Sequence, residues 1–190
     1  MKKIMFNDRY GLTYAVIEGR KTMTRRIVPT KTRLRRALAI IHDEPHGTEQ
    51  EEYMKSARYK VGEIVAVAQR YYCVVSPECD APVDGMDRAP GWRNKMFVRA
   101  DLMPFQIRIT GIKCERLQDI SNEECLREGI RQFTPNFPKN LPIHPTHFVV
   151  GDILKDTPRE AFAALIDKVS GRGTWASNPW VVAYEFELVK

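Results

Sequence analysis

The segment from Gly19 to Arg26 contains the densest group of residues with chemical potential. Within eight positions it holds six polar residues, which are Arg20, Lys21, Thr22, Thr24, Arg25 and Arg26. A guanidinium group binds phosphate or a base edge through two parallel hydrogen bonds. A lysine among arginines loses proton affinity, and a threonine beside such a base can act as a nucleophile. Alternatively, the threonines serve strand formation and the cations are solvated.

Lys21 and Thr24 can cooperate only if the backbone brings them together. Side chains alternate along a regular strand, so these two residues would point to opposite faces. A helix that ends at Gly19 would place Lys21 in a turn instead, because glycine tolerates the left-handed conformation that follows a helix. We expect Lys21 in this turn, at the start of a strand over Lys21–Val28.

Glu128 is a second candidate because of its position in a short predicted helix. Ser121 and Glu124 form a capping box that opens this helix, and Gly129 closes it. A carboxylate in the last turn opposes the helix dipole at a cost of about 0.3–1 kcal/mol, which a neighbouring cation would offset. The alternative is an exposed glutamate whose small cost is tolerated.

Positive charge is concentrated in one part of the chain. Eight of the 30 basic residues lie within residues 19–42, where no acidic residue occurs. Because the net charge of the whole chain is +6, the remainder carries −2. Arg33, Arg35 and Arg36 fall in a helix expected over residues 32–41. Such a patch attracts phosphates in a salt-dependent manner, and the alternative is a solvated helix face.

The remaining composition argues against metal, disulfide or membrane chemistry. The four cysteines form no CxxC pair, so we expect reduced thiols. His144 and His147 are the one closely spaced pair of potential ligands, and they stand alone in a proline-rich stretch, so we expect no metal and no cofactor. No apolar run approaches the roughly 18 residues that span a bilayer, and no signal peptide is evident. We expect a cytoplasmic protein.

The periodicity of apolar residues predicts an α+β fold in a single domain over residues 1–190. The expected strands are Lys21–Val28, Ile64–Val75, Phe105–Glu115 and Val181–Val189. The alternation slips at Thr110 and Gly111, which indicates a bulge that bends the third of these strands. With short flanking helices, this predicts a small curved or closed β-barrel. Long loop insertions are expected at about residues 30–58, 76–95 and 131–156.

The pattern Gly19-x-Lys21-x-x-Thr24-x-Arg26 resembles the signature of the ASCH domain family, a branch of the PUA-like superfold. The similarity continues over residues 59–65, 108–130 and 175–188. Members of this family have a small β-barrel with flanking helices and a cleft lined by the signature, and they are generally associated with RNA or nucleotides. The resemblance therefore implies a cleft that contains Lys21 and Thr24.

One bacterial branch of the family consists of N4-acetylcytidine amidohydrolases, which use a lysine, a threonine and a later glutamate. These positions match Lys21, Thr24 and Glu128. The resemblance implies that Thr24 is the nucleophile, that Lys21 is its base and that Glu128 orients the lysine. The chain is considerably longer than those enzymes and is more similar to larger bacterial and phage members.

Two functions follow, with a nuclease as a third and weaker alternative. The first is an amidohydrolase that acts on an acylated nucleoside such as N4-acetylcytidine. The second is a non-catalytic RNA- or nucleotide-binding module that uses the same cleft. The residues expected to bind the nucleoside or RNA are Gly19, Arg20, Arg25, Arg26, Arg33, Arg35 and Arg36. An aromatic residue near the cleft could stack a base, although we expect Trp180 to pack in the core.

Overall fold

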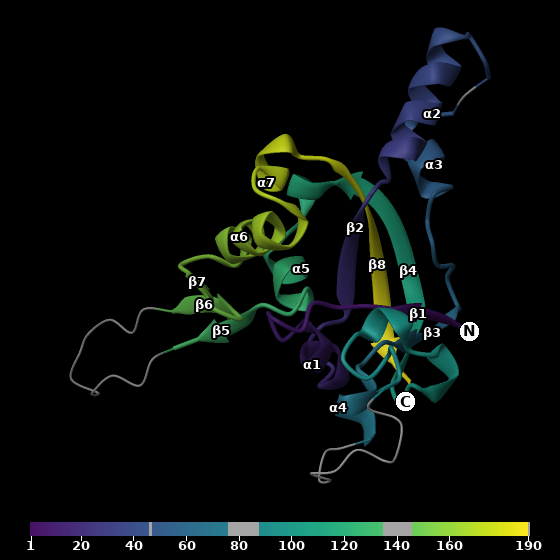
Figure 1. Ribbon diagram of the computed structural model, residues 1–190. Helices are drawn as coiled ribbons and strands as arrows, with labels where there is room; N and C mark the ends of the chain where they lie inside the picture. The colour runs from purple at the N-terminus through teal and green to yellow at the C-terminus, as the bar shows by residue number, and fades with distance from the viewer. Residues whose placement is uncertain (46, 76–87, 135–145, 190) are drawn as a thin grey trace.

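The computed structural model describes residues 1–45, 47–75, 88–134 and 146–189. Within these ranges the chain has the mixed α+β composition expected from the sequence (Figure 1). The strands are β1 (Lys2–Ile4), β2 (Met23–Ile27), β3 (Ile64–Val67), β4 (Gln106–Arg116), β5 (Arg131–Phe133), β6 (His147–Val150), β7 (Ile153–Lys155) and β8 (Trp180–Leu188). The α-helices are α1 (Leu12–Ile17), α2 (Thr30–Ile41), α3 (Glu49–Met54), α4 (Tyr71–Val75), α5 (Asn122–Arg127), α6 (Pro158–Ser170) and α7 (Thr174–Ser177). Short 3-10 helices span Lys95–Phe97, Ala100–Leu102 and Leu117–Asp119.

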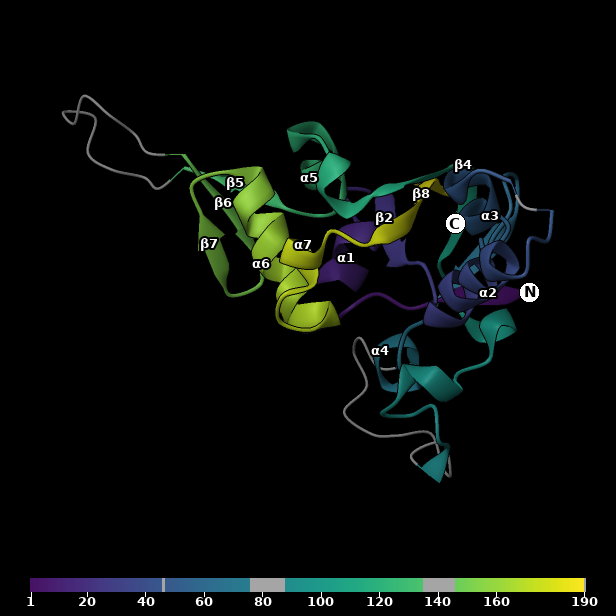
Figure 2. The same ribbon diagram turned by 90° about the horizontal axis from the view of Figure 1, so that it is seen from above.

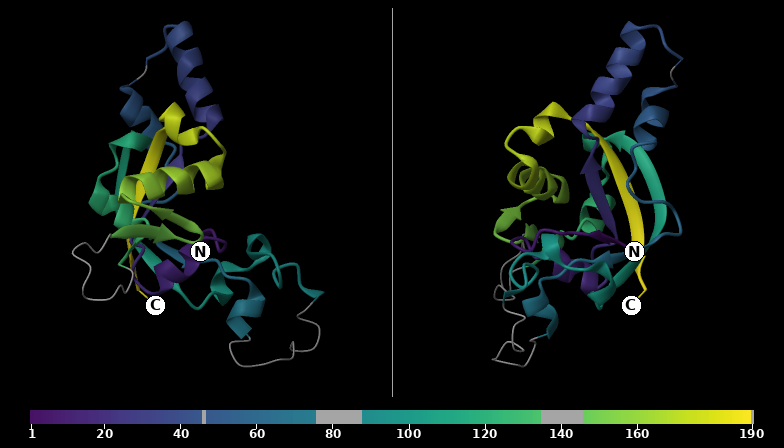
Figure 3. Two further views of the ribbon diagram at one scale, coloured as in Figure 1. Left: turned by 90° about the vertical axis from the view of Figure 1, so that its left-hand side faces the viewer. Right: turned by 45° about the vertical axis from the view of Figure 1, so that its right-hand side comes forward.

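The larger sheet contains five strands in the order β1-β3-β4-β8-β2. Its edge strand β1 runs parallel to β3, and the other pairings are antiparallel. The long strands β4 and β8 run side by side through the centre of the molecule and bend along their length (Figures 1 and 3). Their register shifts between Ile109 and Gly111, so the predicted bulge is confirmed.

The two edges of this sheet come close to each other. The strand order is open, with β1 at one edge and β2 at the other, and no backbone ladder joins these two strands in the described ranges. The Arg26 guanidinium of β2 nevertheless donates a hydrogen bond of 2.7 Å to the carbonyl of Met5, directly after β1. The sheet is therefore strongly curved, and its closure into a barrel stays a prediction.

The strand predicted over Ile64–Val75 is wrong in its second half. β3 ends at Val67, and residues 71–75 form helix α4. The backbone N–H of the buried Tyr71 donates to the Gly91 carbonyl at 3.1 Å. The ring lies so near this glycine that a Cβ there would be 2.5 Å from a ring carbon. Packing of Tyr71 against Gly91 therefore outweighs the β-propensity of the segment.

The long loop predicted over residues 131–156 contains a second small sheet, so this prediction is wrong for its described part. Three antiparallel strands lie in the order β5-β6-β7. β6 and β7 are joined by the two-residue turn Gly151-Asp152, in which Gly151 has a φ of 56°. The four prolines that indicated a loop lie within residues 135–145, outside the described residues.

Two groups of helices lie at opposite sides of the molecule, with α5, α6 and α7 in one group and α2 and α3 in the other (Figure 2). α6 contacts α5, α7 and the small sheet. On the other side, α2 projects away from the larger sheet with α3 near its base, and α2 has no buried residue (Figure 1). The main core joins Val65, Ile107 and Phe186 of the larger sheet to Val16 of α1 and Phe162 of α6. No helix in the described ranges is long and apolar enough to cross a membrane.

Candidate functional site

Lys21 lies in the turn between α1 and β2. Gly19 has a φ of 72°, and β2 begins only at Met23. The backbone N–H of Lys21 donates to the Ala15 carbonyl at 2.8 Å, which fixes the turn against the helix. The expected turn position of Lys21 is therefore confirmed. Its side chain points inward, and the residue is only 2% exposed.

The Lys21 ammonium group uses all three of its N–H donors within the protein. Nζ lies 2.5 Å from Glu128 Oε2, 2.7 Å from the Glu128 carbonyl oxygen and 2.8 Å from the Met23 carbonyl oxygen. These acceptors suit a charged lysine, which has three donors and no acceptor. Burial nevertheless lowers the pKa of Lys21 below the ordinary lysine value, and the Glu128 carboxylate opposes this shift.

Glu128 follows the last residue of α5 and is also buried. Its carboxylate contacts two cations, because Oε2 pairs with Lys21 and Oε1 lies 3.2 Å from Arg25 Nη1. These contacts supply the offset expected for a carboxylate at the negative end of a helix. The capping box predicted for this helix is confirmed, since Ser121 and Glu124 satisfy each other's backbone N–H groups.

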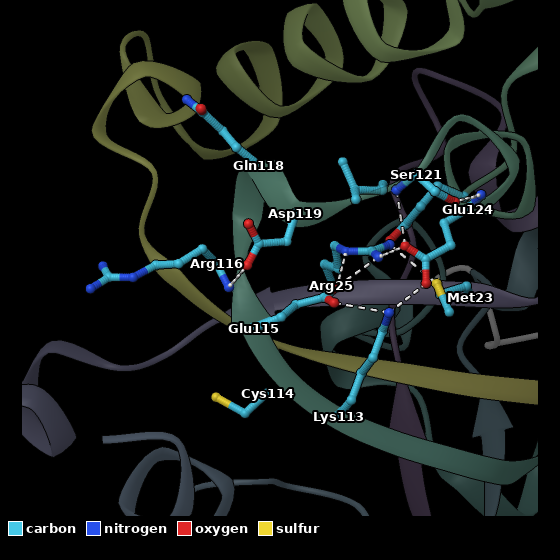
Figure 4. Close-up of polar contacts among 12 residues, drawn as sticks. Met23, Arg25, Lys113, Cys114, Glu115, Arg116, Gln118, Asp119, Ser121 and Glu124 are labelled. Carbon is cyan, nitrogen blue, oxygen red and sulfur yellow. Dashed lines mark hydrogen bonds and ion pairs between the residues drawn. The ribbon is translucent and has the colours of Figure 1, made fainter. Parts of the chain in front are cut away.

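Arg25 connects Glu128 to two further glutamates. Its Nη2 atom lies 2.7 Å from both Glu115 Oε1 and Glu124 Oε2 (Figure 4). Lys113 pairs with the same two glutamates, at 2.9 and 2.5 Å. Three cations thus face three carboxylates in what we name the ion cluster, which consists of Lys21, Arg25, Lys113, Glu115, Glu124 and Glu128.

The ion cluster holds four parts of the fold together. It links the turn before β2, β2 itself, β4 and α5. Because much of it is withdrawn from water, removal of one partner would leave a buried charge without a counter-ion. The Arg25 side chain is 1% exposed, so it stabilises the fold from inside and does not present its guanidinium at the surface.

A cavity of about 450 Å³ lies beside the ion cluster. Lys21, Thr24 and Glu128 all line it, together with Arg25 and Arg26. Part of its wall is apolar and comes from α6, through Phe162, Leu165, Ile166 and Val169. A cavity of this size with an apolar wall and a few convergent polar groups is typical of a site for a small organic ligand. We name it the signature cavity.

Thr24 faces the signature cavity from β2, where it lies opposite Tyr184 of β8. The residue is buried, and its hydroxyl forms no hydrogen bond with any part of the chain that the structure describes. Lys21 Nζ donates to three other acceptors, so a direct hydrogen bond between Lys21 and Thr24 is not formed. A contact through one water molecule stays a prediction.

Arg26 lies between the signature cavity and a smaller one of about 230 Å³. Arg58, Tyr59 and Tyr184 line the smaller cavity. The Arg26 side chain is exposed, and its guanidinium carbon lies 5.8 Å from the centroid of the Phe6 ring. Arg26 is therefore the arginine of the signature that can contact a ligand in either cavity.

The other predicted binding residues lie away from the signature cavity. Arg20 is exposed in the turn after α1 and pairs with Glu18, with 2.7 Å between Nε and Oε2. Arg33, Arg35 and Arg36 lie on α2 and line two further cavities, neither of which shares a lining residue with the signature cavity. The structure thus separates the signature from the basic helix.

The sequence did not indicate that Lys113, Glu115 and Glu124 would form ion pairs near the signature residues. A signal was present, because Lys113 and Glu115 are two residues apart on a strand and so share a face. Glu124 and Glu128 are four apart and share a helix face. These local patterns do not reveal that the two faces meet across Arg25, because that contact depends on how α5 packs beside β4.

The described cysteines and histidines do not line the signature cavity. The three described cysteines are free, and burial raises the pKa of Cys114 to about 11 and that of Cys125 to about 12. Neither is therefore a thiolate at neutral pH. The described ranges hold no group of three or more histidine, cysteine, aspartate or glutamate residues suited to a metal ion. His147 pairs with Asp156 at 3.1 Å, and His144 lies outside the described residues.

Comparisons with known proteins assign no function to this geometry. No protein-family model, no curated protein and no solved structure matches the chain.

Proposed function

We propose that the chain is an ASCH-type nucleoside- or RNA-binding domain and an amidohydrolase that removes the acyl group from a modified nucleoside such as N4-acetylcytidine. One observation carries the proposal: Lys21 in the turn before β2, Thr24 on β2 and Glu128 directly after α5 all line one cavity. The resemblance of residues 19–26 to the ASCH signature supplies the reaction class.

Thr24 is the nucleophile of the proposed reaction. Its hydroxyl oxygen attacks the acyl carbonyl carbon while its proton passes to the neutral amine of Lys21, directly or through one water molecule. The tetrahedral intermediate then loses its C–N bond, and the exocyclic nitrogen of the base takes up the proton from Lys21. Water hydrolyses the resulting Thr24 ester, which releases the carboxylic acid and restores the hydroxyl.

Lys21 must be neutral to accept the proton. Burial favours the neutral amine by lowering the pKa of Lys21, and Glu128 opposes this shift while holding Nζ at 2.5 Å. A neutral amine has two N–H donors and one lone pair. Lys21 would therefore lose one of the three hydrogen bonds that it now donates to Met23 and Glu128. The exposed guanidinium of Arg26 is suited to stabilise the oxyanion that forms during attack.

The proposal also places the fold in the PUA-like class, with a small β-barrel as its core. Three features support this placement: the bulge at Gly111, the bend of β4 and β8, and the hydrogen bond between Arg26 and Met5 that links the two edges of the sheet. Bulges of this kind bend strands where a sheet curls towards closure.

A non-catalytic RNA- or nucleotide-binding module is the second candidate, and one observation favours it. All three donors of Lys21 are satisfied by Met23 and Glu128, as expected for a lysine whose role is to stabilise the fold. In this case the ion cluster would be structural. Arg26 and the arginines of α2 would bind phosphate.

A screen of acylated nucleosides separates the two candidates. The purified full chain is incubated with N4-acetylcytidine, with other N4-acylcytidines and with N6-acyladenosines, and the deacylated nucleoside is measured by chromatography. Deacylation of at least one compound supports the amidohydrolase. Binding without deacylation of any compound supports the binding module. If the chain neither binds nor deacylates any of these compounds, both candidates are contradicted.

A further inference from the structure

A second cavity, of about 430 Å³, lies where the basic helix α2 meets α3 and the ends of β4 and β8. It shares no lining residue with the signature cavity. Arg33 and Arg36 of α2, Tyr53 of α3, Arg116 of β4 and Trp180 of β8 are among its lining residues. We name it the arginine cavity, and nothing in the proposed deacylation uses it.

Two buried N–H donors at the arginine cavity have no acceptor. Arg36 Nε and Trp180 Nε1 are inaccessible to solvent and form no hydrogen bond among the described residues. One further side-chain atom in the described ranges shares this property, and it is an oxygen elsewhere in the fold. Buried donors in proteins almost always have a partner, so two of them at one cavity indicate an acceptor that the described part of the chain does not supply.

The charges around the arginine cavity favour an anion. Arg33, Arg36 and Arg116 bring three positive charges, and Glu49 is the one acidic residue among the lining residues. The Glu49 carboxylate is already engaged, because it accepts a hydrogen bond of 3.0 Å from Tyr53 and lies 3.6 Å from the Arg116 guanidinium. Arg33 and Arg36 form no ion pair with any described residue, although Arg36 lies near enough to the Glu52 carboxylate to contribute to the lowering of its pKa. Without an ion-pair partner, both guanidinium groups can bind a ligand.

The aromatic ring of Trp180 is not free to stack on a base. The Arg116 guanidinium carbon lies over the ring at 4.6 Å from its centroid, and the Tyr53 ring meets it edge-on at 5.7 Å. Trp180 therefore has its ring covered by neighbouring side chains, while its N–H group has no acceptor. A ligand that accepts from this N–H and from arginines is an oxyanion, since guanidinium groups match the geometry of phosphate oxygens.

We propose that the arginine cavity is a phosphoryl-binding site, in which small side-chain movements on binding bring Arg36 Nε and Trp180 Nε1, both closed to solvent in the free chain, to the oxygens of a phosphate group. Arg33 and Arg116 balance its charge. The group belongs either to free phosphate or a mononucleotide, or to the backbone of a single-stranded RNA. This inference does not depend on the proposed deacylation, because the two cavities are separate.

Indole resonances give a direct test. The ¹⁵N-labelled full chain has three tryptophans, and Trp180→Phe identifies the indole N–H signal of Trp180. Inorganic phosphate is titrated at constant ionic strength against chloride. We expect a saturable shift of the Trp180 signal, while the signals of Trp92 and Trp175 stay in place. A shift that does not saturate, or that affects all three signals alike, would overturn the site.

Two variants that each remove one positive charge distinguish specific phosphate binding in the arginine cavity from nonspecific electrostatic attraction to α2. Arg36→Gln should weaken phosphate binding at least about tenfold, because it removes a charged hydrogen bond. Lys31→Gln removes one positive charge from the same helix at a residue that does not line this cavity, and it should change binding less than about twofold. Equal losses in the two variants would contradict the proposal. Melting temperatures establish that both variants are folded.

A competition experiment identifies the source of the phosphate. A single-stranded oligocytidylate that shifts the Trp180 signal and is displaced by inorganic phosphate would assign the site to the RNA backbone. A shift by phosphate and cytidine 5′-monophosphate alone would assign it to a small ligand. Thr24→Ala should leave both titrations unchanged, so failure of the deacylation proposal and failure of this one are distinguishable.

Discussion

The basic segment of residues 19–36 divides into two regions that hold positive charge in opposite ways. Lys21 and Arg25, in its first half, are buried and paired with glutamates of β4 and α5. Arg33 and Arg35, in its second half, are exposed on α2 and form no ion pair in the part of the chain that the structure describes. Lys21 and Arg25 therefore differ from Arg33 and Arg35 in environment, although all four are cations of one basic segment.

This difference shows that burial, and not charge density, decides what a basic residue does. Charges in the interior interact strongly, so each pairing matters and each loss leaves an uncompensated charge. Exposed arginines cost little to remove, and they act on a distant phosphate through a field that salt screens. The ion cluster should therefore respond to mutation in stability and pH dependence, and α2 in salt-dependent binding.

Arg25→Ala should be the most destabilising of these changes. It leaves Glu115, Glu124 and Glu128 without their shared cation, which should cost about 3–5 kcal/mol in the free energy of unfolding. Urea denaturation at neutral pH measures this. Arg35→Ala is the matched control, because it removes the same side chain from an exposed position and should change stability by no more than about 0.5 kcal/mol. Equal losses of stability in Arg25→Ala and Arg35→Ala would show that the buried and the exposed arginine do not differ in their contribution to the fold.

The cost of Arg25→Ala should shrink as the pH falls. In the parent protein, burial raises the pKa of Glu124, but contacts with Lys113 and Arg25 outweigh it and leave the pKa lowered below 4.5. The parent therefore loses stability as the pH falls through that region. In Arg25→Ala, Glu124 keeps Lys113 but loses Arg25, so its pKa should be lowered less and the variant should lose less stability over the same pH range. Urea denaturation at neutral and at acidic pH should show that the difference in free energy of unfolding between the parent and Arg25→Ala is smaller at acidic pH. A constant difference would identify the loss as one of packing.

Glu128→Gln should reduce deacylation partially and move its pH dependence. Glutamine keeps an oxygen acceptor for Lys21 but removes the charge that raises its pKa, so the pKa of Lys21 should fall further. In the parent, the rate should rise with pH as Lys21 becomes neutral and level off below the ordinary lysine value of 10.5. In the variant, the same rise should occur at lower pH. A profile that does not move would exclude Lys21 as the base.

Replacement of Arg33, Arg35 and Arg36 together by alanine should have little effect on stability. It should selectively weaken the binding of RNA. Each lost phosphate contact should lower the slope of log affinity against log salt by roughly 0.7 for single-stranded RNA. Fluorescence anisotropy over a range of salt concentrations measures this slope. RNA binding equal to that of the parent across the range would show that α2 is only a solvated face.

Local patterns in the sequence were sufficient for several parts of the fold. The alternation around Phe105–Glu115 predicted β4, and its slip at Gly111 predicted the bulge. Gly19 predicted the turn that holds Lys21, and the pair of Ser121 and Glu124 predicted the start of α5. In each case the signal lies within a few residues, so no knowledge of the tertiary structure is needed.

The rest depends on contacts between distant segments. Tyr71–Val75 has the composition of a strand and forms a helix because Tyr71 packs against Gly91. The prolines of residues 135–145 led to the prediction of a loop in place of the small sheet. Gly151-Asp152 between two apolar runs is nevertheless a recognisable hairpin turn. The ion cluster could not be predicted, because Arg25 joins carboxylates that lie about ninety and a hundred residues further along the chain.

The role of Thr24 as nucleophile is best tested by measuring deacylation of N4-acetylcytidine by Thr24→Ala and Thr22→Ala. The two variants remove the same hydroxyl two residues apart, but Thr22 accepts a hydrogen bond of 3.1 Å from Arg127 and does not line the signature cavity. We expect Thr24→Ala to abolish deacylation with nucleoside binding largely intact, and Thr22→Ala to retain activity. An undiminished rate in Thr24→Ala would contradict the role of Thr24 as nucleophile.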